Sequence, residues 1–386
     1  MKILIVNNNM NIGGIQKSLA NLLSELSGSE YEIDLMLFCK TGELLADIPE
    51  NINIIEGNFF TKALGITHAE AKQCGFAEFI NRSFWAVLTK IFKTRFTFGI
   101  LSRLQRLDKS YDCAVSFMQN GDEKTFYGGC AEFVLNSVKA QKKICFIHCD
   151  FKNYGGNCEY NRKTLAKFDK IAAVSNSAAD VLKQAVPDIA DKTVTVHNCC
   201  DFKRIPHLAN EYAAEYLPDR INLFTAARLH SEKGILRMLP IFCRLKENGL
   251  KFIWRIAGDG PDRAKAERLI KEYGLENDII LLGNLKNPYP YFKSADTVLV
   301  PSYNEAAPMV FDEARMFGAP IFTTDTTSAD ETVAQTNSGI VCKNTDESIE
   351  KTLYKYICGF IPHKNKTSLT DNSAALAEFD GLIKRR

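Results

Sequence analysis

Two glutamates and a proline mark the stretch of this sequence with the clearest chemistry. Glu305 and Glu313 flank Pro308, and an apolar run from Thr297 to Val300 precedes them. The run predicts a buried strand and Pro308 the start of a helix, which puts Glu305 on the connecting loop and Glu313 inside the helix. A helix N-terminus binds phosphate, and carboxylates accept hydrogen bonds from sugar hydroxyls. The stretch therefore predicts a pocket for a nucleotide-sugar.

A glycine pair near the N-terminus forms a second candidate ligand contact. Gly13 and Gly14 separate the predicted strand at residues 2–8 from a helix whose apolar residues recur at helical spacing from Ile15 to Leu26. The pair lacks the Gly-x-Gly-x-x-Gly spacing of a dinucleotide fingerprint, so it does not predict a nicotinamide site. It predicts either a tight turn or a loop whose backbone approaches a ligand closely.

His148 is the third candidate, because it follows the predicted strand Lys143 to Ile147. Ligand-binding residues of α/β sheets lie at such strand ends, and a histidine there can touch a hydroxyl or phosphate or exchange a proton. A lone histidine is also commonly structural. Nearby cysteines and histidines could in principle hold zinc, but no Cys-x-x-Cys pair occurs and the candidate ligands are far apart in sequence. We expect these cysteines to be reduced core residues.

Length and charge narrow the class of protein. The chain has 386 residues and a formal net charge of +2, which predicts two domains and gives no general reason to expect nucleic acid as a partner. The N-terminal apolar run is too short for a signal-peptide core, and no stretch of about 18 apolar residues occurs. We expect a cytoplasmic protein.

Short strands alternating with helices must position these residues. The alternation predicts an α/β fold with two parallel sheets, each with helices on both faces. The expected divisions of the chain are an N-terminal domain at residues 1–201, a linker at 202–219, a second domain at 220–365 and a C-terminal helix within 366–386.

A basic insert interrupts the first domain at about residues 60–110. From Asn81 to Ser110 the sequence carries seven Lys or Arg residues and one acidic residue, Asp108, interleaved with aromatic and aliphatic side chains. A basic amphipathic segment of this kind binds an anionic membrane surface. The alternative is an ordinary helix that buries its apolar stripe in the domain, but the one-sided charge favours membrane contact.

The second half of the chain resembles the retaining glycosyltransferases of family 4. The resemblance lies between Phe224 and Thr324, in Ala227-Arg228-Leu-His-Ser-Glu-Lys233-Gly234, Ile256-Ala-Gly-Asp-Gly-Pro261, Leu282-Gly-Asn284, Ala295-Asp296, Pro301-Ser302, the pair Glu305 and Glu313, and Gly318-Ala-Pro320. The first half matches more faintly, at Gly13-Gly14, His148, Ser175 and Asn198-Cys-Cys-Asp201. The resemblance implies the GT-B fold, in which two Rossmann-like domains face each other across a cleft.

The resemblance also implies roles for individual residues. Arg228 and Lys233 would contact the donor diphosphate, Glu305 the transferred sugar and Glu313 the ribose, without a metal or other cofactor. Two further groups of residues complete the implied site, namely Gly258, Leu285, Ala306, Ala307, Met309 and Val310 on the donor side, with Gly13, Gly14 and His148 on the acceptor side. Ala306 and Pro308 stand where the commonest family pattern has glycine, as does Cys199 in the Asn-Gly-x-Asp pattern.

The expected activity is transfer of a hexosyl residue from a nucleoside-diphosphate sugar, UDP before GDP, with retention at the anomeric carbon. The expected acceptor is a polyprenyl-diphosphate-linked or other glycan in surface polysaccharide synthesis, such as a capsule, reached at the inner face of the cell membrane. Rival interpretations are an epimerase or phosphorylase of the same fold, and a catalytically silent scaffold that binds another glycosyltransferase.

Overall fold

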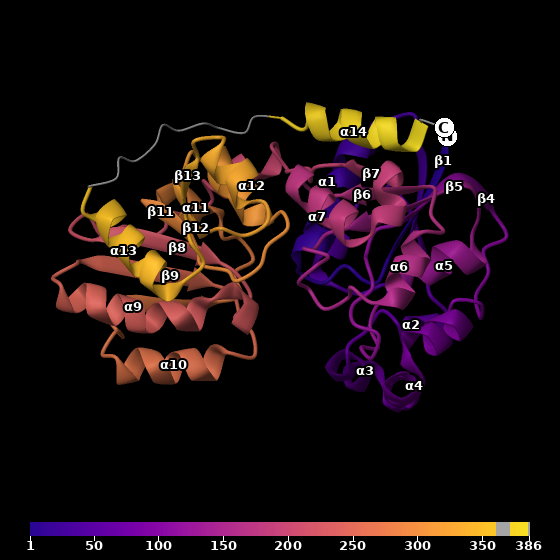
Figure 1. Cartoon of the computed structure of the whole chain (residues 1–386), viewed down its shortest axis with the longest axis horizontal. Coiled ribbons are helices and arrows are strands. Elements are labelled where there is room, and N and C mark those ends of the chain that lie inside the picture. The colour runs from indigo at the N-terminus through magenta and orange to yellow at the C-terminus, as the bar shows by residue number, and fades with distance from the viewer. Residues whose placement is uncertain (360–370, 385–386) are drawn as a thin grey trace. The chain divides into compact units, whose positions relative to one another are not determined.

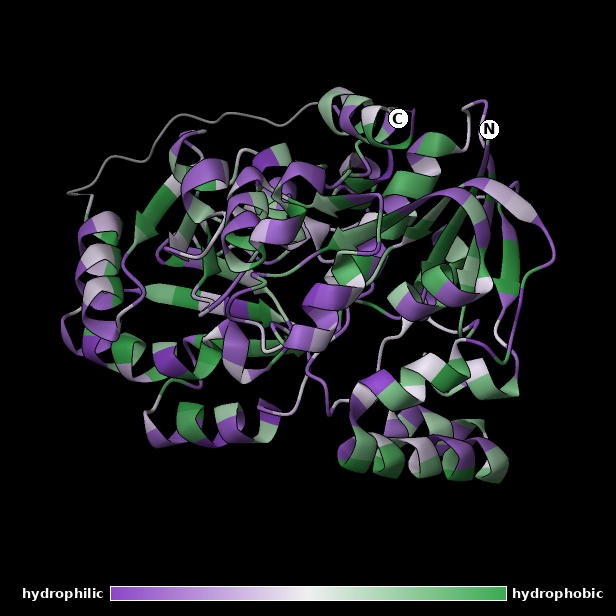
Figure 2. Cartoon of the chain, turned by 45° about the vertical axis from the view of Figure 1, so that its right-hand side comes forward, coloured by the Kyte–Doolittle hydropathy of each residue, from purple (hydrophilic) through white to green (hydrophobic). Residues whose placement is uncertain are grey.

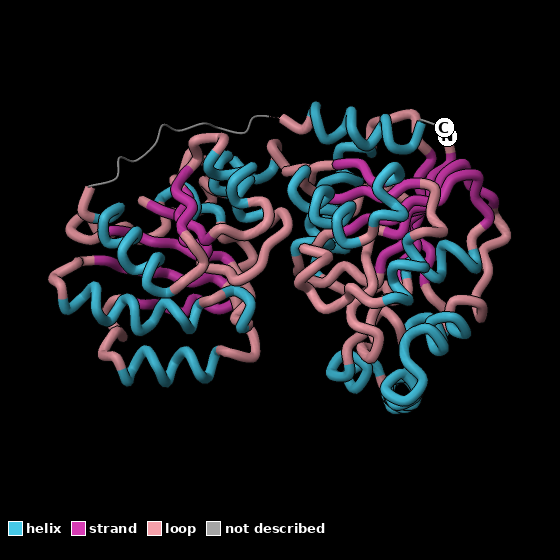
Figure 3. The backbone as a smooth tube through the Cα atoms, viewed as in Figure 1, coloured by secondary structure: helices cyan, strands magenta, loops and turns pink. Residues whose placement is uncertain are grey.

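The computed structural model describes residues 1–359 and 371–384, which fall into two compact α/β units (Figure 1). The first unit comprises Met1–Cys199 and Asn372–Arg386, and the second comprises Cys200–Asp371. Each unit has one parallel sheet with helices packed against it (Figure 3). The predicted α/β class is confirmed.

The first unit is built on a seven-stranded sheet in the order β3-β2-β1-β4-β5-β6-β7. Its strands are β1 (Lys2–Asn7), β2 (Glu32–Leu37), β3 (Asn53–Glu56), β4 (Ser110–Ser116), β5 (Lys139–Ile147), β6 (Lys170–Ala173) and β7 (Thr193–Thr195). All neighbouring pairs are parallel, and Ile3 of β1 lies opposite Ile33 of β2 and Cys113 of β4. The strand order reverses between β1 and β4, which is where open α/β sheets bind ligands.

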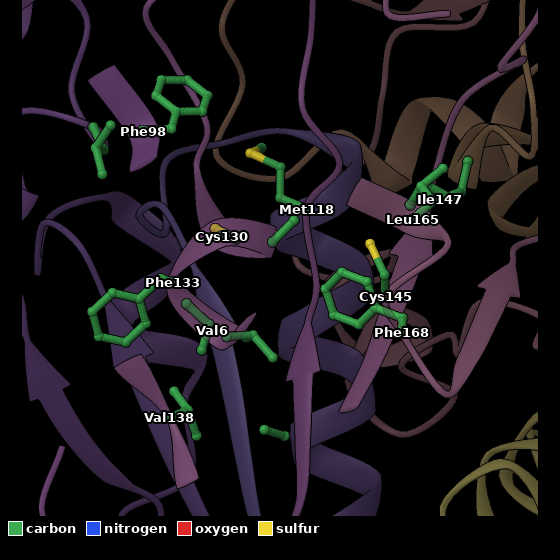
Figure 4. Close-up of a cluster of buried hydrophobic side chains, with 14 of the residues drawn as sticks. Val6, Phe98, Met118, Cys130, Phe133, Val138, Cys145, Ile147, Leu165 and Phe168 are labelled. Carbon is green, nitrogen blue, oxygen red and sulfur yellow. The ribbon is translucent and has the colours of Figure 1, made fainter. Parts of the chain in front are cut away.

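Alternation along the strands gives this sheet two cores. In β1, Leu4 and Val6 join the cluster drawn in Figure 4, whereas Ile3 and Ile5 join the cluster on the other face. The covering helices are α1 (Gly14–Leu26), α2 (Phe59–Lys62), α3 (His68–Cys74), α4 (Phe76–Leu101), α5 (Cys130–Ser137), α6 (Glu159–Leu165), α7 (Asn176–Ala185) and α14 (Ser373–Lys384).

Helix α14 returns the end of the chain to the first unit. Phe379 is fully buried, and its ring lies 6.5 Å from that of Phe146 in β5. Glu378 accepts hydrogen bonds from the backbone and Nδ1 of His197, both at 2.9 Å. The expected C-terminal helix within 366–386 runs from Ser373 to Lys384, and residues 366–370 lie outside the described residues.

The second unit has a six-stranded parallel sheet in the order β10-β9-β8-β11-β12-β13. The strands are β8 (Ile221–Ala226), β9 (Phe252–Ala257), β10 (Ile279–Gly283), β11 (Thr297–Val300), β12 (Ile321–Thr324) and β13 (Gly339–Cys342). The helices are α8 (Arg204–Leu208), α9 (Ile235–Glu247), α10 (Arg263–Glu272), α11 (Tyr289–Ser294), α12 (Met309–Met316) and α13 (Asp346–Ile357).

The segment 202–219, expected to be a linker, contains helix α8 and packs within the second unit. Ile205 and Ala209 are buried in the same cluster as Phe224 and Phe311. Their burial anchors a segment whose polar residues and prolines suggested an exposed connection. Residues 360–365, expected to end the donor domain, lie outside the described residues.

Candidate active site

The predicted residues of the second unit gather at the carboxyl edge of its sheet. Because the strands are parallel, their C-terminal ends share one edge. Arg228 and Lys233 follow β8, Gly258 follows β9, Leu285 follows β10 and Glu305 follows β11. The strand order reverses between β8 and β11, so this edge is the topological switch point at which such sheets bind ligands.

An ion pair joins the loops that follow β8 and β11. Lys233 Nζ lies 2.6 Å from Glu305 Oε1, and the two side chains are only 26% and 10% exposed. Ser302 is buried and donates its hydroxyl to the same carboxylate oxygen at 2.7 Å. Two residues that are 72 positions apart in sequence thus meet across the switch point, with Glu305 held from both sides.

Arg228 is a second cation and precedes Lys233 in the segment that follows β8. Its side chain is exposed and has no hydrogen bond or ion pair with any described residue. A guanidinium in this state offers its planar fork of N–H donors to an anionic ligand without first breaking a contact.

Gly234 and Gly258 fix the backbones of the loops on which these groups lie. Gly258 has φ of +140°, and a Cβ added there would lie 1.9 Å from the carbonyl oxygen of Ala227. At Gly234, φ is +68° and an added Cβ would lie 2.0 Å from the carbonyl oxygen of Pro301. The close approach of neighbouring backbones therefore accounts for glycine at both positions.

Helix α12 points its N-terminus to the same edge. Pro308 is the N-cap residue and no side chain caps the helix, whose first turn begins with Met309 and Val310. Early N–H groups of a helix lack intrahelical acceptors, and the dipole there favours an anion. Glu313 lies on the second turn and is buried. The predicted helix start at Pro308 is confirmed.

Four residues that were not predicted from the sequence support the loop before α12. Arg237 on α9 donates from Nε to Asp346 at 2.7 Å and from Nη1 to Asn344 at 2.5 Å, and its guanidinium lies 4.2 Å from the ring centre of Tyr303. Asn344 in turn donates to the Tyr303 carbonyl oxygen at 2.9 Å. This Arg237 bracket (Arg237, Tyr303, Asn344 and Asp346) holds the chain two residues before Glu305.

In the first unit, His148 follows β5 at the carboxyl edge of the sheet. Its ring lies 4.8 Å from that of Phe117 and 5.7 Å from that of Phe146, and Nε2 is buried without a hydrogen-bond partner among the described residues. Burial lowers the pKa of His148 to about 3, against the effect of a hydrogen bond with the Phe117 backbone. The imidazole is therefore neutral near pH 7 and has an unused ring nitrogen.

Gly13 and Gly14 lie where β1 leads into α1, at the same edge. Gly13 is extended with φ of −173°, so no left-handed conformation requires either glycine. A Cβ at Gly13 would meet the movable side-chain oxygen of Gln16 at 2.6 Å, and one at Gly14 would meet nothing within 4 Å. The backbone at Gly14 is therefore open to an approaching group.

The residues that the structure describes include no group of three or more His, Cys, Asp or Glu side chains arranged to hold a metal ion. No described helix combines the length and hydrophobicity required to cross a membrane.

Comparison with known families identifies the second unit. Residues 214–358 match the family described as "Glycosyl transferases group 1". This part of the chain is a group 1 glycosyl transferase domain. The match contains the ion pair of Lys233 and Glu305, Arg228, α12 and the whole Arg237 bracket.

Curated relatives of the group 1 domain include bacterial proteins named as glycosyltransferases. EpsF of Bacillus subtilis, described as a glycosyltransferase, is 31% identical over 107 residues, 28% of each chain. The amylovoran biosynthesis glycosyltransferase AmsD of Erwinia amylovora is 25% identical over 143 residues, 37% of this chain and 40% of its own. The matched segments thus span well under half of these relatives.

Solved structures extend the likeness to the whole fold. A glycosyltransferase from Rickettsia africae matches with a TM-score of 0.65 at 16% identity, covering 100% of this chain and 99% of its own. HepE from Anabaena, solved in complex with UDP, matches with a TM-score of 0.63 at 15% identity, covering 98% and 96%. The chain has the GT-B fold of these glycosyltransferases, as predicted.

Proposed function

We propose that this protein is a retaining glycosyltransferase of family 4. It moves a hexosyl residue from a nucleoside-diphosphate sugar to a glycan acceptor. The observation that carries the proposal is the ion pair of Lys233 and Glu305 across the switch point of a group 1 domain. HepE, whose fold is similar, was solved with UDP and with UDP-glucose, which favours a UDP-sugar over a GDP-sugar donor.

The proposed roles follow from charge and position. Arg228 and Lys233 bind the diphosphate and stabilise the negative charge that develops as it leaves, without a metal ion. The N–H groups of Met309 and Val310 support the same anion from the start of α12. The carboxylate of Glu313 accepts hydrogen bonds from the ribose hydroxyls, and the carboxylate of Glu305 faces the transferred sugar.

Four smaller residues complete the proposed donor pocket. Ala306 and Ala307 line the loop before α12, and Leu285 and Gly258 line the ends of the two neighbouring strands. Because Ala306 is buried and Leu285 is half buried, they form apolar walls whose size would select the base and the sugar.

Transfer proceeds with retention in this proposal. The bond between the anomeric carbon and the diphosphate oxygen breaks while the acceptor oxygen bonds to the same face of that carbon. The acceptor proton passes to the departing diphosphate. His148, neutral near pH 7, lies at the acceptor side of the site, and the open backbone at Gly13 and Gly14 accommodates the acceptor.

The proposed acceptor is a polyprenyl-diphosphate-linked oligosaccharide of surface polysaccharide synthesis. Two of the relatives, AmsD and the colanic acid glycosyltransferase WcaL of Escherichia coli, carry names from such syntheses. An acceptor of this kind is held in the bilayer by its lipid, so the protein would act at the inner face of the cell membrane.

The test combines binding and turnover. A panel of nucleoside diphosphates and their sugars should raise the melting temperature selectively, and the stabilising donor should release nucleoside diphosphate when a glycan acceptor is added. Lys233→Ala should lower turnover by about 100-fold or more. The exposed Lys265 on α10 provides the matched control, because Lys265→Ala leaves the edge of the sheet unchanged.

Three results would contradict the proposal in different ways. Unchanged turnover in Lys233→Ala would show that this lysine has no role in the proposed donor site. Nucleotide binding without transfer to any acceptor would support the silent scaffold instead. Inversion at the anomeric carbon, seen by NMR of the product, would exclude the retaining mechanism.

A further inference from the structure

Helix α4 turns an apolar face to solvent. Most of the large apolar side chains that are exposed in the described part of the chain lie between Phe59 and Leu104. Along the first segment of α4 they recur every three or four residues, which places them on one side of the helix. The members of this stripe are Phe76, Ile80, Phe84, Val87 and Ile91.

The exposure of this stripe is large. Phe76 is 81% exposed and Ile91 is 64% exposed. The stripe is therefore not packed in the domain core, and the alternative in which this segment buries its apolar stripe is wrong for these five residues. Figure 2 shows hydrophobic segments along the helices at the lower right, where α3 and α4 lie.

Polar groups occupy the buried side of the same helix. Asn81 is buried and donates to the Phe59 carbonyl oxygen at 2.8 Å, and Thr89 is buried and donates to the carbonyl oxygen of Trp85 at 2.8 Å. Arg82 is also buried, with its guanidinium 4.8 Å from the ring centre of Phe126. These polar groups share the buried side of α4 with Phe98 and Leu101, which pack in the cluster of Leu4 and Val6, so the side that faces water is the one that carries the stripe.

A break at Lys93 separates this stripe from a shallow basic hollow. Lys93 has φ of +64°, so α4 continues in a new direction from Thr94, whose backbone N–H donates to the Glu123 carbonyl oxygen at 2.7 Å. Beyond the break, apolar and basic side chains alternate around a hollow. It is lined by Phe92, Arg95, Phe96, Gly99, Ile100, Arg103 and Leu104.

Uncommitted cations surround the apolar residues. Lys90, Arg95 and Arg106 are exposed and have no hydrogen bond or ion pair with any described residue. Lys93, by contrast, is paired with Glu123. Between Asn81 and Ser110 only Asp108 is acidic. Acidic groups from elsewhere lie near this segment, because Glu123 pairs with Lys93 and the pKa of Glu159 is lowered chiefly by Lys163 and to a smaller extent by the charge of Arg95, but none pairs with Lys90, Arg95 or Arg106 in the described structure.

We propose that the exposed side of α4 is an insertion surface for an anionic phospholipid bilayer. The stripe from Phe76 to Ile91 and the rim of the hollow enter the boundary between headgroups and acyl chains. Lys90, Arg95 and Arg106 pair with lipid phosphates, and the complementary charge favours lipid over a neutral protein partner. This surface belongs to the first unit, and lipid binding does not depend on sugar transfer.

The two tryptophans of the chain provide a direct measurement. Trp85 lies on α4 beside Phe84, with ring centres 5.4 Å apart, whereas Trp254 is fully buried in the second unit. The full chain is mixed with vesicles of phosphatidylcholine alone or with added phosphatidylglycerol. We expect vesicles with phosphatidylglycerol to change the tryptophan fluorescence and brominated lipid to quench it. Trp85→Phe should abolish both effects, while the protein still floats with the vesicles.

Matched variants separate the apolar and charged contributions. Phe84→Ser with Ile91→Ser should reduce flotation at least about tenfold. Lys90→Glu with Arg95→Glu should reduce flotation by a similar factor and should also remove the dependence of flotation on salt concentration. The controls Tyr354→Ser and Lys351→Glu change exposed residues of α13 in the second unit and should leave flotation unchanged.

Two results would overturn the proposal. One is flotation that is equal on neutral and anionic vesicles, or absent on both. The other is a dimer in solution that Phe84→Ser with Ile91→Ser converts to monomer, because the stripe would then be covered by a second copy of the chain.

Discussion

Gly234 links Lys233 to helix α9, and its geometry makes a sharp prediction. Both the left-handed φ and the 2.0 Å approach to the Pro301 carbonyl oxygen exclude a side chain. Gly234→Ala should therefore destabilise the second unit by about 3 kcal/mol and reduce turnover, since Pro301 opens the loop that carries Glu305. Urea unfolding and initial rates measure the two effects.

Gly249 supplies the control for that change. Its φ is +82°, yet an added Cβ would meet nothing within 4 Å. Gly249→Ala should therefore cost only about 1 kcal/mol, the penalty of the left-handed conformation, and turnover should not change. Equal losses in the two variants would contradict the role assigned to the backbone approach at Pro301.

His148 makes the stability of the first unit depend on pH. Because burial lowers its pKa from 6.5 to about 3, the unfolded chain binds this proton more readily than the folded chain between those values. Stability should be complete above about pH 6.5 and fall as the pH drops toward 3, with a loss on the order of 1–2 kcal/mol at pH 5. Hydrogen exchange of β5 at pH 7 and pH 5 measures this.

Replacing the ring separates this effect from general acid sensitivity. His148→Phe keeps an aromatic ring between Phe117 and Phe146 but cannot bind a proton, so the difference between pH 7 and pH 5 should shrink by that amount. His207→Phe, at an exposed histidine of α8, should leave the difference unchanged. A His148→Phe chain as acid-sensitive as the parent would refute the assignment.

Among the elements, α9, β13 and α13 together position the loop before α12 through the Arg237 bracket. The Arg237 side chain is only 4% exposed, and Arg237→Met would keep its length while removing the contacts with Tyr303, Asn344 and Asp346. We expect a loss of about 1–3 kcal/mol in the stability of the second unit and about a tenfold fall in kcat. Thermal unfolding and steady-state rates measure these quantities.

Arg244 on the same helix is the matched control. It pairs with Glu350 on α13 at 2.6 Å, as Arg237 pairs with Asp346, but it is 46% exposed. Arg244→Met should cost at most about 1 kcal/mol and leave kcat unchanged. Similar falls in kcat for both variants would show that the loop responds to α9 as a whole, against the role given to the bracket.

Strand β11 and helix α12 show which parts of the fold the sequence could predict. The run at residues 297–300 and the proline at position 308 place strand β11 and helix α12 correctly, because apolar runs and helix-start chemistry are local signals. Adjacent parallel strand ends then bring Lys233 and Glu305 to one edge of the sheet.

What the sequence did not predict depends on distant packing. Asn344 follows β13, a four-residue strand in a polar context that periodicity does not reveal. The burial of Ile205 in the segment 202–219 likewise needs partners such as Phe311, which lies far along the chain. In α4 the basic and apolar residues were visible, but which side faces solvent is decided by neighbours such as Phe59 and Phe126.

At the scale of the whole molecule, the chain builds the first unit from both of its ends. Cys200–Asp371 forms the second unit, and α14 then completes the apolar face of the first sheet, where Ala375, Phe379, Leu382 and Ile383 join the cluster of Ile3 and Ile5. The stability of the first unit should therefore depend on residues that follow the entire second unit in sequence.

Phe379→Ala tests this dependence directly. Phe379 is fully buried against Phe146, so the substitution should destabilise the first unit by about 3–5 kcal/mol. Hydrogen exchange should accelerate in β1 and β5 and stay unchanged in β8 and β9, because the cluster that Phe379 joins is made of residues of the first unit. Tyr354→Ala, on the exposed side of α13, should change the free energy of opening measured by hydrogen exchange by no more than about 0.5 kcal/mol in either pair of strands. Faster exchange in β8 and β9 after Phe379→Ala would mean that α14 stabilises both units, and its assignment to the first unit alone would be wrong.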